Sequence, residues 1–339
     1  MKIQTYIFLF IFVFQSNAQI VDFETVKFEK ADKIALKYKG ENLSNLPQLS
    51  YKLTHELTTD VERFRAIFKW VCSNIANDYD MYSRNMRKRK RYKDDTIKFA
   101  EWNDKFKKIA FQKLLKKNRT VCTGYAYLIK ELANLASIEC EIVNGNARTS
   151  TINIENLTVD APNHSWNAVK LNDKWYLCDP TWASGIPNPI TYRFQFEFND
   201  GFFLSDPNMF SINHHPVDEK WFLLHTEKPT FDMFLEAPVI YGKAYEYFGN
   251  HIQPKKLDNT IKQGDTVIFR FQLLHPINKK DIRFVFEKND NEKEIQPKLI
   301  TITKQQLVIN HTFESRGHYD VHLYIKDDLI STYSFNVKK

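Results

Sequence analysis

Three residues of this chain carry the side chains of a thiol-based catalytic site: Cys122, His164 and Asp179. They occur in this order along the chain, each in a short motif suited to its chemistry. A thiol attacks as the thiolate, so it needs a neighbouring imidazole or a helix N-terminus that favours the ionised sulfur. A carboxylate bonded to the imidazole holds that ring in one tautomer. The three residues therefore predict a nucleophile, a general base and a group that orients the base.

The segment after Cys122 has the periodicity of an amphipathic helix. Its apolar residues recur at helical spacing, namely Tyr125, Leu128, Ile129, Leu132, Leu135 and Ala136. Cys122 is therefore predicted at or just before a helix N-terminus, where the partial positive charge favours the thiolate. Its backbone N–H is then one candidate donor to an oxyanion, whereas the sequence does not identify a second donor.

A predicted β-hairpin brings His164 close to Asp179. Residues 164–171 and 174–179 are expected to be strands joined by a two-residue turn, which places Trp166 opposite Asp179. His164 lies on the same face as Trp166, so it is a diagonal neighbour of Asp179 within side-chain reach. The turn decides this prediction, because a slip of one residue would put the two side chains on opposite faces.

Each of the three residues also has a structural interpretation when it is taken alone. A cysteine on a helix is commonly a small buried hydrophobe, and a histidine in a strand is commonly a hydrogen-bonded core residue. Aspartate before proline is a frequent turn or cap residue. The conjunction of three motifs favours the catalytic interpretation. The alternative is a non-catalytic binding or scaffold protein that keeps the thiol for packing.

The motifs resemble those of the transglutaminase-like superfamily. They read Cys122-Thr-Gly-Tyr-Ala, His164-Ser-Trp-Asn and Asp179-Pro-Thr-Trp, and Phe203-Leu-Ser-Asp-Pro-Asn-Met-Phe and His214-His-Pro are similar to the kyphoscoliosis peptidase branch. The resemblance implies a papain-like α+β fold and a Cys–His–Asp triad. It also implies acyl transfer or hydrolysis through a thioester, as in a cysteine peptidase or a transglutaminase, with a protein or peptide as substrate.

The chain is expected to have four parts. Residues 1–18 combine a lysine, an apolar core and Ser-Asn-Ala, which is typical of a secretory signal peptide. This predicts a mature N-terminus at Gln19 and a periplasmic or extracellular location. An N-terminal segment, 19–54, precedes the transglutaminase-like domain, 55–235. Short alternating apolar segments in 236–339 predict an all-β sandwich of the immunoglobulin-like type.

The four cysteines, Cys72, Cys122, Cys140 and Cys178, do not form a disulfide framework. With Cys122 as a free nucleophile, only one bridge could form among the other three. Cys72 and Cys178 are predicted to be small buried residues. No CxxC or HExxH spacing is present, so we expect neither a metal nor another cofactor.

Positive charge is concentrated in one short run. The chain has a net charge of +7, and much of the excess lies in Arg84–Lys93. This run is either a solvated loop between helices or an arm that contacts an acidic substrate or another anionic surface. Without interleaved aromatic residues or a nucleic-acid-binding fold, it does not predict nucleic-acid binding. Stable membrane insertion is not expected, because no apolar run after the leader reaches the length of a span.

Overall fold

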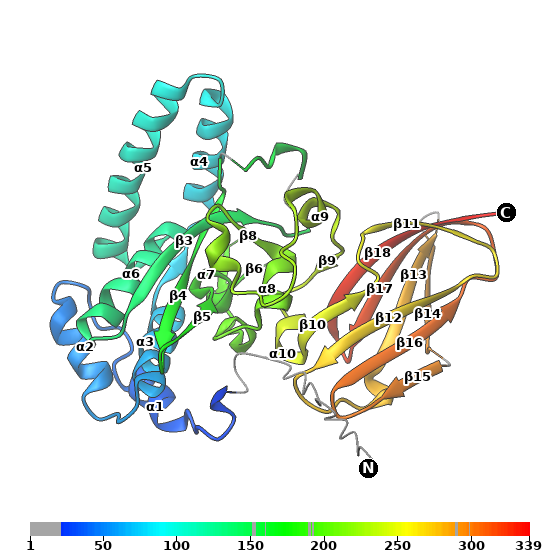
Figure 1. Cartoon of the computed structure of the whole chain (residues 1–339). Coiled ribbons are helices and arrows are strands. Elements are labelled where there is room, and N and C mark those ends of the chain that lie inside the picture. The colour runs from blue at the N-terminus through cyan, green and yellow to red at the C-terminus, as the bar shows by residue number, and fades with distance from the viewer. Residues whose placement is uncertain are drawn as a thin grey trace, which may run out of the picture.

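The computed structural model describes residues 22–150, 154–159, 161–188, 191, 193–288, 291–297 and 299–339. The predicted signal peptide, 1–18, and the predicted mature N-terminus at Gln19 lie outside the described residues. The chain forms two parts that lie next to each other, a mixed helical and sheet part and an all-β part (Figure 1). None of the helices in the described ranges is both long and apolar enough to span a bilayer.

Helices make up most of the first part. They are α1 (Glu29–Lys37), α2 (Leu46–Thr54), α3 (Asp60–Asn74), α4 (Tyr79–Tyr92), α5 (Thr96–Lys117), α6 (Cys122–Leu135), α7 (Pro180–Ser184), α8 (Pro207–Asn213), α9 (Phe231–Glu236) and α10 (Ala244–Tyr247). The central helix α3 begins with a capping box between Thr59 and Glu62. Its side chains Phe64, Phe68 and Trp70 are fully buried, so α3 forms much of the core under α6.

The helices surround an antiparallel sheet with the strand order β5-β4-β3-β8. The strands of this part are β1 (Ala76–Asn77), β2 (Arg119–Thr120), β3 (Cys140–Ala147), β4 (His164–Leu171), β5 (Lys174–Cys178), β6 (Gly185–Pro187), β7 (Phe194–Phe196) and β8 (His214–Pro216). Helix α6 packs against β3 and β4, and the Asn167 amide donates to the Ala126 carbonyl at 2.9 Å. Helices packed on an antiparallel sheet make this an α+β domain, as predicted.

The turn between β4 and β5 has the geometry on which the His164–Asp179 prediction depends. Asn172 and Asp173 both have positive φ, 48° and 61°, as in the type I′ turn that suits a two-residue hairpin. Pairing runs from Leu171–Lys174 to Asn167–Cys178. The predicted register is therefore confirmed, and His164 and Asp179 lie at the same end of the hairpin.

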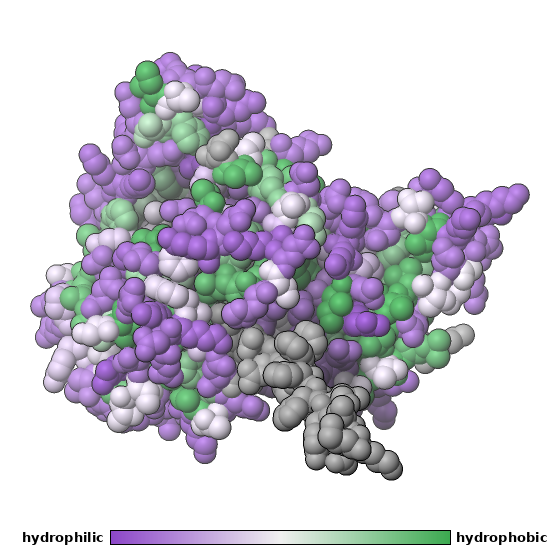
Figure 2. Space-filling model, viewed as in Figure 1, coloured by the Kyte–Doolittle hydropathy of each residue, from purple (hydrophilic) through white to green (hydrophobic). Residues whose placement is uncertain are grey.

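The basic run is helical and not a loop. Arg84–Lys93 overlaps almost entirely with α4, which forms a helical hairpin with α5 that projects from the domain (Figure 1). Asp78 caps α4 by accepting the N–H of Met81 at 3.0 Å, and lysine and arginine are good helix formers. The loop interpretation is therefore wrong. Hydrophilic side chains cover most of this hairpin in the surface view of Figure 2.

The second part is a sandwich of two sheets. Its strands are β9 (Val239–Ile240), β10 (Phe248–Gln253), β11 (Asp258–Lys262), β12 (Thr266–Leu273), β13 (Ile282–Lys288), β14 (Asn291–Ile295), β15 (Leu299–Ile302), β16 (Gln306–Thr312), β17 (Gly317–Ile325) and β18 (Asp328–Lys338). One sheet has the order β10-β12-β16-β15 and the other contains β11-β18-β17-β13-β14. The strands β10, β12, β16 and β15 correspond to A, B, E and D of an immunoglobulin-like fold, and β13, β17 and β18 correspond to C, F and G. The Tyr319 hydroxyl donates to the Ser315 carbonyl at 3.0 Å, which is the arrangement of a tyrosine corner.

The segment 237–247, which contains β9 and α10, connects the two parts and contacts both of them. The short strand β9 pairs with β18, with Ile240 opposite Ser331. The Tyr245 ring packs on Phe202 with centroids 4.4 Å apart, and its hydroxyl donates to the Met209 carbonyl at 3.3 Å. Helix α10 therefore packs on the segment between α7 and β8, which connects Asp179 with His214 along the chain.

Candidate active site

Cys122 is the first residue of α6, and Val121 is its N-cap. Val121 has no polar side chain to bond the first turn, and the helical bonds begin with Gly124 and Tyr125, whose N–H groups donate to the Val121 carbonyl. The first amides of a helix have no partner within it, so the N–H of Cys122 points out of the helix. The nucleophile therefore lies beside an amide donor and the positive end of a helix.

Gly124 sets how closely the strand before α6 approaches the helix. A Cβ at Gly124 would overlap the hydroxyl of Thr120, whose side chain fills the space above the first turn. Thr120 also donates from its hydroxyl to the Ala110 carbonyl at 3.4 Å. The glycine thus accommodates Thr120 and fixes the approach of β2 to the nucleophile.

The thiol of Cys122 is in an environment that favours its ionised form. Burial alone would raise its pKa, but hydrogen bonds from the His164 ring and the Ser165 backbone N–H, with the charge of His164, lower the pKa below the ordinary value. By contrast, burial raises the pKa of the Cys72, Cys140 and Cys178 thiols. All four cysteines are free and buried. Cys122 is the one of the four suited to act as a thiolate.

His164 begins strand β4 and lies between the thiol and a carboxylate. Its Nε2 is 2.7 Å from Oδ2 of Asp179, which leaves Nδ1 to face Cys122. Burial would lower the pKa of His164, but the charge and hydrogen bond of Asp179 and the contact with Cys122 raise it to about 10. The lowered pKa of the thiol and the raised pKa of the imidazole both favour the thiolate–imidazolium form of the pair.

Asp179 orients the imidazole with one oxygen and caps a helix with the other. Its Oδ1 accepts the backbone N–H groups of Thr181 at 2.8 Å and Trp182 at 3.1 Å, at the start of α7. Although burial opposes it, the charges and hydrogen bonds of His164 and His214 hold the pKa of Asp179 well below its ordinary value. The cap interpretation and the orienting role thus apply to the same side chain.

His214 is a site residue that the sequence reasoning missed. It begins β8 and is fully buried, and its Nε2 lies 3.1 Å from Oδ2 of Asp179. The run His214-His-Pro was noted in the sequence only for its similarity to a family branch. No local spacing rule connects it with Asp179, which is 35 residues earlier and meets it only in the folded sheet.

The grouping of His164, Asp179 and His214 includes residue types that bind metals, and their ligand atoms lie within 4.8 Å of one another. An ion would need its ligands at about 2.0–2.2 Å, arranged around it. Here Oδ2 accepts directly from both rings, at 2.7 and 3.1 Å. Such direct hydrogen bonds leave no space between donor and acceptor, so the arrangement does not fit a metal site.

The basic hairpin, defined as residues 79–117, forms one wall beside the nucleophile. Val121 shares a buried cluster with Met81, Phe106 and Ala110 of this hairpin. Arg89 donates to the Pro162 carbonyl at 2.9 Å, two residues before His164. Burial, and then the charge of Cys122, raises the pKa of Tyr82 to about 12, which places this phenol near the thiol.

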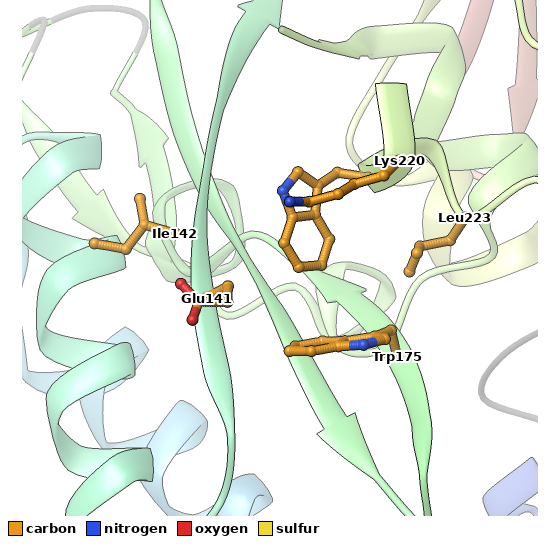
Figure 3. Close-up of a pocket in the computed structure, with 6 residues that line it drawn as sticks. Glu141, Ile142, Trp175, Lys220 and Leu223 are labelled. Atoms are coloured by element: carbon orange, nitrogen blue, oxygen red, sulfur yellow. The ribbon is translucent and has the colours of Figure 1, made fainter. Parts of the chain in front are cut away.

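A hollow of about 730 Å³ lies on another surface of the domain (Figure 3). It is lined by Glu141, Ile142, Trp175, Lys220, Trp221 and Leu223. The rings of Trp175 and Trp221 meet edge to face, with centroids 5.1 Å apart. None of these six lining residues is a cysteine, so thioester chemistry does not belong there. Cys122 and His164 open to solvent only narrowly, since each is 8% exposed.

Comparison with known proteins places the first part of the chain in a family. Residues 47–180 match the family model described as the transglutaminase-like superfamily. The chain is 31% identical to the Homo sapiens protein named kyphoscoliosis peptidase over 210 residues, 62% of this chain and 29% of that protein. It is 22% identical to Drosophila melanogaster hillarin over 313 residues, 87% of this chain and 35% of that protein. The chain therefore spans only about a third of the length of these relatives.

Among solved structures, the I81 domain of titin is 17% identical, with 26% of this chain and 95% of that chain covered and a TM-score of 0.17. Assignment of the sandwich rests instead on its own strand order and tyrosine corner. For the first part, the matched residues 47–180 contain Cys122, His164 and Asp179 and both strands of the hairpin that joins the last two. The chain belongs to the transglutaminase-like superfamily, on its kyphoscoliosis peptidase branch.

Proposed function

We propose that this protein is an exported cysteine enzyme that acts on amides of proteins or peptides. One observation carries the proposal: Cys122, His164 and Asp179 are joined by hydrogen bonds in the order that thiol catalysis requires. The lowered pKa of the thiol and the raised pKa of the imidazole supply a nucleophile and a proton donor together.

The proposed reaction has two halves. The Cys122 thiolate attacks the amide carbonyl, and the Cys122 N–H stabilises the oxyanion that forms. As the C–N bond breaks, His164 gives its Nδ1 proton to the departing amine, which leaves a thioester and a neutral imidazole. Water or a second amine then attacks the thioester and passes a proton to His164. The thiolate leaves, and the product is a carboxylic acid or a new amide.

Whether the enzyme hydrolyses or transfers depends on which nucleophile reaches the thioester. A protease or amidase admits water, and a transglutaminase-type enzyme admits an amine. The triad is the same for both, and Asp179 has the same orienting role in each. The proposal therefore covers hydrolase and acyltransferase chemistry, and the acceptor specificity is a property of the surroundings of the thiol.

One observation favours a second candidate, a non-catalytic binding or scaffold protein. Cys122 and His164 are each 8% exposed, which is a narrow opening for a peptide substrate. In such a protein the triad residues would stabilise the fold, and a partner would bind elsewhere. Reactivity of the thiol with a small electrophile separates the two candidates, because a catalytic thiolate must be reachable.

We expect iodoacetamide to label Cys122 of the native protein at pH 6. Its pKa is lowered, so the thiolate persists below the pH at which an ordinary cysteine ionises. Amide turnover should fall as the pH rises through about 10, where His164 loses the proton that the leaving amine needs. Peptide mass spectrometry locates the label. In the exported protein, the same measurement should show that the N-terminal peptide begins at Gln19.

The buried thiols Cys72, Cys140 and Cys178 are the internal controls, because their raised pKa values keep them protonated. Labelling confined to Cys122, together with turnover of an amide, supports the enzyme. A thiol at Cys122 that reacts only above pH 8, like an ordinary cysteine, would favour the binding or scaffold protein. An N-terminus at Met1 would contradict export by signal cleavage.

We also propose that the basic hairpin attracts acidic protein substrates to the thiol. Residues 79–117 contain fourteen Lys and Arg but five Asp and Glu, a net charge of +9 against +7 for the whole chain. The positive excess is thus concentrated beside Cys122, and the rest of the chain is slightly acidic. Arg84, Arg87, Lys90 and Arg91 are exposed, and no ion pair involves them in the described residues.

Replacing these four residues by Ser should slow association with an acidic peptide several-fold at low salt. The loss should shrink as salt rises, because exposed charges are screened within about 8 Å at physiological ionic strength. Turnover at saturation should stay the same, since the residues act before the chemical step. Stopped-flow binding measures the effect. Four exposed lysines of the sandwich, Lys255, Lys262, Lys279 and Lys304, replaced by Ser, provide the matched control. Equal salt dependence in both variants would contradict the proposal.

A further inference from the structure

His214 makes a second imidazole contact with the carboxylate that orients His164. Its Nε2 lies 3.1 Å from Oδ2 of Asp179, the same oxygen that lies 2.7 Å from His164 Nε2. The side chains of His214 and Asp179 are both inaccessible to solvent. The Cys–His–Asp mechanism needs only one imidazole on this carboxylate, so the second contact requires its own account.

The position of the proton on His214 follows from its neighbours. Burial, together with the positive charge of His164, lowers the pKa of His214 although Asp179 opposes this, so the ring is neutral at pH 7. A neutral ring has one N–H. Both ring nitrogens face an oxygen, Nε2 at 3.1 Å from Oδ2 of Asp179 and Nδ1 at 3.2 Å from the Phe210 carbonyl. The ionised carboxylate is the stronger acceptor, so the single proton belongs on Nε2, which donates to Asp179.

The direction of this N–H is fixed by the packing of the ring. The Phe210 ring is stacked on His214, with centroids 3.8 Å apart and an interplanar angle of 12°. Trp182 and Trp166 pack on it at centroid distances of 4.4 and 5.1 Å. The backbone is held as well, because His214 pairs with Ala147 across β8 and β3. The ring cannot turn away from Asp179 without disturbing this cluster.

The other titratable groups near the carboxylate are uncharged. Burial is the largest cause that raises the pKa of Cys72 on α3, of Cys178 on β5, of Tyr245 on α10 and of Tyr125 on α6. The charge of Asp179 raises the pKa of each of them further. Among the described residues, the charges of the triad are those of Cys122, His164 and Asp179, and the Arg89 guanidinium of α4 adds a positive charge on the side of the thiol. His214 adds a donor without adding a charge.

We propose that His214 is a positioning residue, which holds Oδ2 of Asp179 towards His164 and thereby sets the pH range of the thiolate–imidazolium pair. Its importance for turnover rests on the proposed function. Its effect on the thiol does not. A donor to a carboxylate stabilises the ionised form, and Asp179 receives four such donors from His164, His214, Thr181 and Trp182. Without His214, the carboxylate loses one donor and is free to turn about its remaining bonds.

The test compares two variants that differ in one donor. His214→Phe fills the aromatic cluster but has no N–H, whereas His214→Gln has an amide N–H that can reach Asp179. We expect the acid midpoint of Cys122 alkylation to rise by about one pH unit in the Phe variant. At a pH well below both midpoints, this corresponds to alkylation about tenfold slower. The Gln variant should recover most of the loss. An unchanged midpoint in a folded Phe variant, or equal shifts in both variants, would overturn the proposal.

A second measurement needs no variant and so does not depend on how the variants fold. In protein labelled with ¹⁵N-histidine, the His214 ring should be in the Nε2–H tautomer at pH 7, and its N–H should be protected from exchange. An Nδ1–H tautomer would overturn the proposal. Because alkylation requires no substrate, the two proposals fail separately. Absence of amide turnover would contradict the proposed enzymatic function, whereas the effect of His214 on the thiol could still be measured by alkylation.

Discussion

Replacing Cys122 by Ala is expected to abolish thioester formation and to leave the fold nearly unchanged. The thiolate is the only atom of the proposed mechanism that bonds to the substrate carbon, so loss of the nucleophile should lower turnover by about 10⁴-fold or more. Alanine is compatible with a helix start, so the free energy of unfolding should change by about 1 kcal/mol or less. Single-turnover kinetics with a chromogenic peptide amide measure the first effect, and denaturant unfolding measures the second.

Cys140→Ala is the matched control for this variant. Cys140 is also a buried free thiol, but it lies in β3 and burial raises its pKa. Its replacement leaves a small cavity and should cost stability of about 1 kcal/mol while turnover is kept. Wild-type turnover in the Cys122 variant would show that the reaction uses another nucleophile. Loss of turnover in both variants would indicate a general defect of folding.

The parts of the site that the sequence predicted correctly are those fixed by local rules. Cys122 begins α6 because the apolar periodicity starts there. His164 meets Asp179 because a two-residue turn sets the register of one hairpin, with both turn residues at positive φ. Such rules act over a few residues, so a single sequence contains enough information to apply them. The β-sandwich itself follows from the alternating pattern of its strands in the same way.

The features that the sequence did not predict depend on contacts distant along the chain. His214 reaches Asp179 only because β8 joins β3 at the edge of the sheet, and nothing in the spacing indicates this pairing. The basic run was ambiguous because its apolar residues are too few for an amphipathic stripe. It becomes a helix wall because Met81 and the helix α5 provide the buried surface that the run lacks.

The buried charge of Asp179 would be unfavourable without the hydrogen bonds that it accepts. Transfer of a carboxylate without partners from water to the protein interior would cost several kcal/mol of free energy. Asp179 is inaccessible to solvent, yet both of its oxygens accept two hydrogen bonds each, and the adjacent imidazolium offsets its charge. The arrangement therefore tolerates an ionised carboxylate and makes it a rigid acceptor for His164.

Replacing Asp179 by Asn is expected to lower turnover about 10⁴-fold, a loss comparable to that for His164→Ala. The two backbone N–H groups of Thr181 and Trp182 require an acceptor, so the Asn carbonyl oxygen should take the place of Oδ1. Its NH₂ group then faces Nε2 of both His164 and His214, which must accept instead of donate. The proton of His164 moves to Nδ1, the nitrogen that faces Cys122, and the ring can no longer take up a proton there.

The Asp179→Asn variant should lose turnover because the His164 tautomer changes and not because the fold changes. A control variant tests this. Asp173→Asn makes the same chemical change at an exposed turn residue with a φ of 61°, which Asn adopts readily. Turnover of the Asp173 variant should equal that of the wild type. In the Asp179 variant, the rate of Cys122 alkylation at pH 6 should fall with turnover, because the imidazolium that stabilised the thiolate is lost. Losses of less than tenfold in both Asp179→Asn and His164→Ala would mean that this buried pair stabilises the fold and takes no part in catalysis.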